Sequence, residues 1–178
     1  MHLRAACRHG FVILNFFFGT LLVASICSVL LSCAHAQTTI TDNLTVTVEI
    51  QAECTIVTTS TLDFGTQGVL DADVDNTGSI TVQCTSDVDY DVGLGAGNGS
   101  SATTSDRRMT GPASASIDYS LYSNSGRTTN WGNTISTDTV SGTGDGSSQV
   151  LTVYGRIPAQ STPAAGTYTD TVQVSVTY

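Results

Sequence analysis

The sequence predicts an all-β fold, an antiparallel sandwich of short strands, and three observations support that prediction. Apolar and polar residues alternate in short runs along residues 44–178, as they do in strands with one buried face. Valine, threonine, isoleucine and tyrosine dominate these runs, and pleated strands favour such side chains. Beyond residue 36 no run keeps the 3.6-residue period of a helix. Seven or eight short strands separated by turn residues are typical of a sandwich.

The first expected strands have clear apolar faces. The run 44–50 (LTVTVEI) is the most regular alternation outside the end of the chain, and the short pieces 54–57 and 62–65 follow it. Next come 79–84 and 89–94, with Asp89 and Asp91 expected on the solvated face. The alternate residues of these last two runs are predicted to point into the core: Ile80, Val82, Cys84, Tyr90, Val92 and Leu94.

The last strands are expected over 115–122, 149–157 and 168–178. The apolar stripe of the terminal strand continues to the final residue, and polar residues fill the positions between, so one face of this strand should be buried. Its members are Val172, Val174, Val176 and Tyr178. Two stretches rich in glycine and serine, 95–106 and 141–148, are predicted to be surface loops.

Residues 1–36 have the pattern of a secretory signal. Arg4 and Arg8 form a basic start, an apolar stretch runs from Phe11 to Leu31, and "AHA" before Gln37 is a small-x-small cleavage site. We expect cleavage after Ala36. Two alternatives stay open: an uncleaved membrane anchor, because the apolar stretch is long, and lipidation at Cys33 after the box-like "LLSC".

Charge and cysteine content restrict the function classes. After residue 36 the chain has four arginines, no lysine, no histidine and all fifteen acidic residues, which gives a side-chain charge of −11. Such a surface repels phosphate backbones, so nucleic acid is excluded as a partner. Cys54 and Cys84 are the two cysteines of this part. An even pair in an exported chain predicts one disulfide, with two free buried thiols as the alternative.

The sequence offers little for catalysis, because histidine and lysine, the commonest general bases and nucleophile activators, are missing after residue 36. The acidic run at Asp71, Asp73 and Asp75 lacks the glycine and the glutamate of a calcium loop, so a solvated turn is favoured over a cation site. Trp131 is a core or loop-packing residue, or alternatively stacks on a sugar. We therefore expect no enzyme, no cofactor, no metal and no small-molecule substrate.

The order of motifs resembles the spore coat protein U domain, the family that includes the pilin subunits of archaic chaperone–usher pili. Seven stretches between residue 49 and the C-terminus carry the resemblance: "EIQAECTI", "LDFG", "GSITVQCTSDVDYDVGL", "SDRRM", "IDYSLYSNSGRTTNWG", "VYGRIPAQ" and "AGTYTDTVQVSVTY". The paired cysteines of the family match Cys54 and Cys84. Its closing "GxYxDxxxVxVxY" pattern matches Gly166 to Tyr178, while the absence of lysine is a departure.

The resemblance implies an incomplete immunoglobulin-like antiparallel β-sandwich that is completed by a donor strand from another subunit. Residues 1–36 are then the signal peptide, 37–50 the donor-strand extension and 51–178 the pilin domain. The implied donor residues are Leu44, Val46, Val48 and Ile50, and the terminal strand borders the acceptor groove. Alternatively, 44–50 is the first strand of the chain's own sandwich, since both arrangements need one apolar face.

The resemblance also implies partners and a location. A periplasmic chaperone fills the groove first, the extension of another subunit replaces it at an outer-membrane usher, and neighbouring pilin subunits thus form a homo-polymer or a hetero-polymer. The chain would be exported through the periplasm to a surface pilus that supports adhesion and biofilm formation. Two other functions stay open: a secreted spore or cell coat protein of the same fold, and a secreted carbohydrate-binding module.

Overall fold

The computed structural model describes residues 37–178, so the predicted signal at 1–36, its cleavage site and Cys33 lie outside the described residues. The described residues divide into two units, 37–46 and 47–178. The second unit holds every strand of the described chain, and residues 37–46 form neither strand nor helix. No helix among the described residues is long and apolar enough to cross a membrane.

Eight strands and one short 3₁₀ helix, η1 (Pro112–Ser114), make up the body. The strands are β1 (Cys54–Thr59), β2 (Val74–Cys84), β3 (Asp89–Leu94), β4 (Arg107–Thr110), β5 (Ser116–Tyr122), β6 (Val140–Thr143), β7 (Ser148–Ile157) and β8 (Val174–Thr177). This count agrees with the predicted seven or eight strands.

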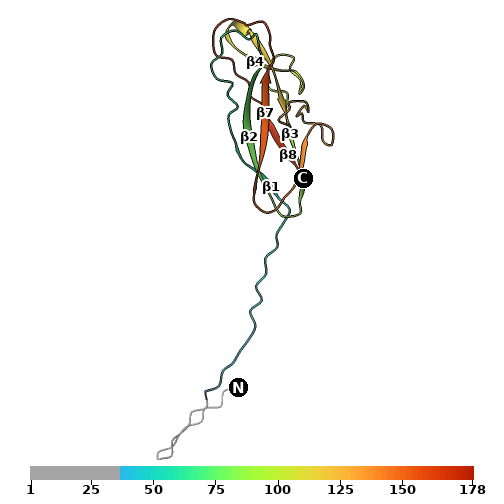
Figure 1. Cartoon of the computed structure of the whole chain (residues 1–178). Helices are drawn as coiled ribbons and strands as arrows, with labels where there is room; N and C mark the ends of the chain where they lie inside the picture. Colours follow the sequence, from blue (N-terminus) through green and yellow to red (C-terminus); the bar gives the residue numbers. More distant parts are fainter. Residues whose placement is uncertain (1–36) are drawn as a thin grey trace, which may run out of the picture. The chain divides into compact units, whose positions relative to one another are not determined.

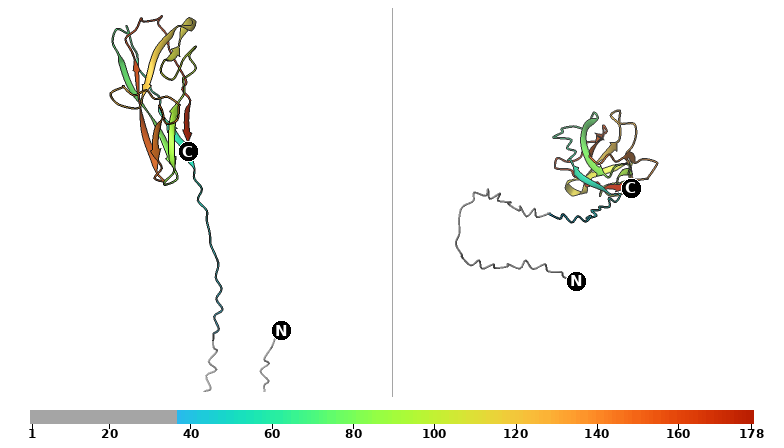
Figure 2. Two further views of the ribbon diagram at one scale, coloured as in Figure 1. Left: turned by 90° about the vertical axis from the view of Figure 1, so that its right-hand side faces the viewer. Right: turned by 90° about the horizontal axis from the view of Figure 1, so that it is seen from below.

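The strands form two antiparallel sheets that pack face to face (Figures 1 and 2). One sheet has the order β1-β2-β7-β5-β4, and the other has the order β6-β3-β8. The centre of the larger sheet is the β2–β7 pair, which is in register from Val74 opposite Ile157 to Gln83 opposite Ser148. This long pair gives the body its rigid middle.

The strand order is that of an immunoglobulin-like sandwich that lacks one strand. A constant-type immunoglobulin domain has strands A, B, E and D in one sheet and C, F and G in the other. Here β1-β2-β7-β5 follows A-B-E-D, and β3-β8 follows C-F. In the described chain nothing occupies the place of G, so β8 is hydrogen-bonded to β3 alone and forms the edge of its sheet. The predicted fold class is therefore confirmed as an incomplete immunoglobulin-like sandwich.

The core lies between the sheets and follows the period-2 pattern of the sequence. All six residues predicted to point inward from 79–84 and 89–94 are at most 3% exposed. Both sheets contribute to one buried cluster: Leu70, Ile80, Val82, Cys84, Tyr90, Val92, Leu94, Tyr119, Leu121, Trp131, Val153 and Ile157.

Three segments of the sandwich differ from the structure predicted for them. The run 62–65 is a loop whose Leu62 and Phe64 pack against the core. The predicted loop 141–148 contains most of β6, because Ser141 and Thr143 pair with β3 and donate side-chain hydrogen bonds to Asp91 and Asp89. The terminal strand is shorter than predicted, since regular pairing with β3 covers only Val174 to Thr177.

Candidate functional site: the open edge of β8

The terminal strand has one face against the core and one edge without a neighbour. Val172, Val174 and Val176 are half-buried and pack against the core cluster, as predicted, whereas Tyr178 is 60% exposed. β3 holds one edge of β8, with Leu94 opposite Val174 and Val92 opposite Val176. The backbone groups of the other edge have no strand to pair with in the described chain, which is the situation that invites β-augmentation.

The other side of this open edge is formed by β1. β1 pairs only with β2, and it contacts β8 across the gap between the two sheets (Figure 1). Ile56 lies opposite the fully buried Val82, so it points toward the core side, yet it is 40% exposed. Val57 follows at a bulge in the ladder and is 51% exposed. We call the β1 and β8 residues together the β1–β8 seam.

The seam has no charged side chains, and its residues are apolar side chains, threonines and one serine. The strands that border it read CTIVTT and VSVT, although residues 37–178 contain nineteen charged side chains. Ile56 was not among the residues singled out from the sequence. The alternation of Cys54 and Ile56 indicated an apolar face on this strand. A run of four residues was too short, however, to show that this face stays uncovered.

The predicted donor residues are exposed in the structure. Residues 37–53 precede β1 and belong to no strand, so 44–50 is not the first strand of its own sandwich here. The exposed fractions are 90% for Leu44, 84% for Val46, 84% for Val48 and 74% for Ile50. Ile40 is 91% exposed as well. Five large apolar side chains are thus exposed in this segment, four of them at alternate positions.

The predicted disulfide is present and lies where the N-terminal segment joins the body. Cys54, the first residue of β1, is bonded to Cys84, the last residue of β2, and the two residues are directly opposite in the ladder. Thr85 reinforces this junction: its hydroxyl donates to the Gln51 carbonyl and accepts from the Glu53 amide, both at 3.1 Å. Its own amide donates to the Glu53 carbonyl at 2.9 Å.

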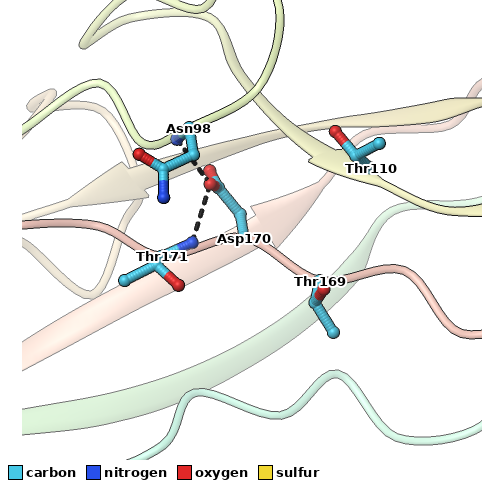
Figure 3. Close-up of a pocket in the computed structure, with 5 residues that line it drawn as sticks. All are labelled: Asn98, Thr110, Thr169, Asp170 and Thr171. Atoms are coloured by element: carbon cyan, nitrogen blue, oxygen red, sulfur yellow. Dashed lines mark hydrogen bonds between the residues drawn. The ribbon is translucent and has the colours of Figure 1, made fainter. Parts of the chain in front are cut away.

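Asp170 lines a shallow polar depression together with Asn98, Thr110, Thr169 and Thr171 (Figure 3). One carboxylate oxygen accepts hydrogen bonds from the amides of Asn98 and Thr171, both at 2.7 Å. The other accepts from the Tyr119 hydroxyl at 2.6 Å. Both oxygens of Asp170 therefore help to hold three segments of the chain together.

Arg107 is a fully buried cation with a structural role. It donates to the carbonyls of Leu94, Gly95, Thr104 and Trp131, at 2.6 to 2.9 Å, and thereby caps the end of β3. Burial lowers its pKa, because desolvation disfavours the charged form. Sequence periodicity gave no sign of this role, since an arginine beside the exposed Asp106 resembles an ordinary surface residue.

Trp131 is a core residue, as the more favoured interpretation held. It is 1% exposed, and its indole Nε1 donates to the Val92 carbonyl at 2.8 Å. A sugar cannot stack on a ring that the protein covers on both faces. Trp131 is therefore not accessible for the sugar stacking that the carbohydrate-binding alternative required.

Asp73 and Asp75 of the acidic run are ion-paired, which corrects the prediction of a simply solvated turn at these two residues. Arg156 contacts Asp75 through two parallel hydrogen bonds of 2.7 and 2.8 Å and also pairs with Asp73 at 3.1 Å. Arg127 contacts Asp75 at 3.2 Å. The hydrogen bond from Arg156 holds the pKa of Asp75 below its usual value. Over residues 37–178 no cluster of three potential ligands could hold a metal ion.

The strand order and the unpaired edge of β8 define the class to which this protein belongs, the immunoglobulin-like sandwiches that lack one strand. The chain belongs to the Spore Coat Protein U domain family, whose model matches residues 40–175 and so includes most of the N-terminal segment.

Two relatives illustrate this membership. Protein U of Myxococcus xanthus is 35% identical over 154 residues, which cover 79% of this chain and 86% of that protein. The crystal structure of the CsuC–CsuE chaperone–tip adhesion subunit pre-assembly complex, from the archaic chaperone–usher Csu pili of Acinetobacter baumannii, contains a chain of similar fold. The TM-score is 0.53 at 24% identity, and the match covers 72% of this chain and 40% of that chain. This second likeness concerns the fold alone.

Proposed function

We propose that this protein is a structural subunit of a surface fibre, an archaic chaperone–usher pilus, and that its subunits join by donor-strand complementation. One observation carries the proposal: the body has an open, uncharged edge at β8, while the same chain carries four alternating apolar residues that are exposed and belong to no strand. Each of these two features is unfavourable in an isolated chain, and each would satisfy the other in a neighbour.

The segment and the seam match in length and chemistry. Leu44 to Ile50 span seven residues, which is long enough to run beside the four residues of β8 and the apolar Val172 and Tyr178 that flank them. Burying four such side chains contributes about 6–12 kcal/mol, at roughly 1.5–3 kcal/mol each. The ladder hydrogen bonds of the added strand satisfy the backbone of β8. The donor and the acceptor are different parts of one chain, so each subunit binds the next head to tail. Such contacts do not form a closed ring, and an open filament results.

The partners follow from this mode of assembly. A subunit with an open seam needs protection before it polymerises, since exposed edges pair wrongly. We infer a periplasmic chaperone as the first occupant of the seam, an outer-membrane usher as the place of exchange, and neighbouring subunits as the final occupants. The family match and the fold shared with a chaperone–adhesion subunit complex support this inference. Adhesion and biofilm formation would then be properties of the polymer, and no catalytic role is proposed.

A coat or matrix component of the same fold is the second candidate. The 35% identity with Protein U and the family's description favour it. Both roles require export, which the sequence pattern of residues 1–36 supports.

Electron microscopy of producing cells, with and without this chain, tests the proposal and separates the two roles. Thin surface fibres that are lost with the chain and labelled by an antibody to it are expected. A continuous layer would favour the coat role, and a soluble monomer in the medium would contradict both.

A further inference from the structure

The position of the disulfide determines how a pull on the N-terminal segment would reach the body. Only residues 51–53 separate the last predicted donor residue, Ile50, from Cys54. Any tension on the segment therefore arrives at the first residue of β1. From Cys54 the tension can pass into the sandwich in two ways: along the backbone of β1, or through the bond to Cys84.

The backbone route is weak, because β1 is poorly held. Within its own chain it is paired with one strand, its ladder is broken by the bulge between Ile56 and Thr58, and all its residues after Cys54 are exposed. Few of its side chains would resist peeling from the edge of the sheet.

The disulfide route leads to the best-anchored strand. β2 lies between β1 and β7, it is in register with β7 over ten residues, and Ile80, Val82 and Cys84 are at most 2% exposed. Beyond the bond, the Cys84 carbonyl accepts from the Gly146 amide at 3.1 Å, and Thr85 is tied to Gln51 and Glu53. The bond thus joins the entry point of the segment to the centre of the larger sheet.

We propose that the Cys54–Cys84 disulfide is a mechanical clamp, which carries tension from the donor segment directly to the end of β2 and prevents residues 55–83 from being pulled out of the sandwich as extended chain. This inference rests on the proposed function, because tension reaches Cys54 only if the segment links one subunit to the next. A sequence separation of 30 residues corresponds to about 100 Å of extended chain. With the bond in place, a subunit of a stretched fibre cannot lengthen by this amount while the rest of its body stays folded.

Stretching single fibres by optical tweezers or force microscopy tests the clamp. Wild-type fibres are compared with fibres of the Cys54→Ser/Cys84→Ser double variant, and with wild-type fibres in dithiothreitol, where the dithiol becomes a cyclic disulfide and both cysteines become thiols. Without the bond we expect each subunit to lengthen partially, by up to about 100 Å, before the rest of its body unfolds. Fibres with the bond should lack this early lengthening.

Two control variants separate the clamp from a general loss of stability. Val153→Ala weakens the core but keeps the disulfide, so its subunits should unfold at lower force without the early partial step. Thr85→Val removes the hydroxyl contacts of the junction and should leave the early step absent as well. Identical curves with and without the bond would overturn the inference, and so would a single step several times larger than 100 Å. If the chain forms no fibres at all, the proposed function itself is wrong.

Discussion

Tyr119 of β5 donates its hydroxyl hydrogen to Asp170, which lies 51 residues later in the chain and just before β8, at a distance of 2.6 Å. Since the other carboxylate oxygen of Asp170 holds the amides of Asn98 and Thr171, this one residue joins β5, the loop after β3 and the start of the terminal segment. Gly97 has a φ of +84°, and a side chain there would collide with the Asp170 carboxylate. The contact fixes the approach of the chain to the open edge.

This relationship predicts a stability change on removal of the hydroxyl. Tyr119→Phe removes the hydroxyl that donates to the half-buried Asp170, which should cost about 1–3 kcal/mol. A loss of this size should lower the midpoint of thermal unfolding by several degrees, as measured by circular dichroism. An unchanged midpoint would show that Asp170 holds the loop through its two amide contacts alone.

The same contact predicts how stability depends on alkaline pH. Burial and the hydrogen bond to Asp170 raise the pKa of Tyr119 in the folded protein well above its ordinary value near 10. The stabilisation is therefore fully present below pH 10 and is lost as pH rises above it, because only the unfolded chain releases the proton readily. Burial also raises the pKa of Tyr90, so a part of the alkaline loss should persist in Tyr119→Phe. Urea unfolding at pH 8 and pH 11 measures the difference between the two proteins.

The Asp75–Arg156 pair predicts a small effect at acid pH. The hydrogen bond from Arg156 lowers the pKa of Asp75, so its contribution is present above the unfolded value of 3.8 and disappears as pH falls further. Because both side chains are partly exposed, Asp75→Asn should cost no more than about 1 kcal/mol at neutral pH. The cost should shrink in high salt, and a salt-independent loss would contradict an electrostatic origin.

The sequence predicted the buried residues correctly wherever one face of a strand meets the core. Ile80, Val82 and Cys84 are buried because a period of two in a central strand leaves a single arrangement possible. Leu62 and Phe64 follow the same period, yet they lie on a loop, where they cover Gly155 of β7 from outside any ladder. Periodicity cannot distinguish these cases, since it records which side chains are apolar and not whether the backbone has a partner.

The contacts of β3, the strand beside the open edge, were harder to predict, because they join residues that are distant in the sequence. Asp89 and Asp91 have the pattern of a solvated strand face, but Thr143 and Ser141 hydrogen-bond to them and thereby turn a glycine-rich stretch into β6. The open edge of β8 was expected only through the resemblance to a family. An alternating strand looks the same in the middle of a sheet and at its edge.

The charge of the chain predicts that assembly depends on salt. Residues 37–178 carry a side-chain charge of −11, while β1 and β8 carry none, so two bodies repel each other although the contact itself is apolar. The Debye length falls from about 30 Å at 0.01 M salt to about 8 Å at 0.15 M. Fibre growth from purified subunits, followed by light scattering, should therefore be faster at the higher concentration. Slower growth would indicate attractive ion pairs between subunits.

The donor-strand proposal predicts opposite outcomes for two charge substitutions. Replacing both Val46 and Val48 with Asp puts two carboxylates where apolar residues of the donor must be buried, a large penalty without a compensating partner. The body of such a subunit is unchanged, so it should accumulate in the periplasm bound to its chaperone, yet fail to polymerise. Val174→Asp instead places a charge beside the core on β8, so that subunit should be degraded before assembly.

A matched control isolates burial from charge. Thr45→Asp/Thr47→Asp adds the same two charges to the polar face of the same segment, so this variant should still enter the seam of a neighbour and form fibres, although more slowly because of its added negative charge. Immunoblots of periplasmic fractions and of sheared surface material compare the three variants with the wild type. If the Val46/Val48 variant vanishes from the periplasm as the Val174 variant does, residues 44–50 belong to the chain's own core. If all three variants polymerise, the seam is filled by something other than this segment.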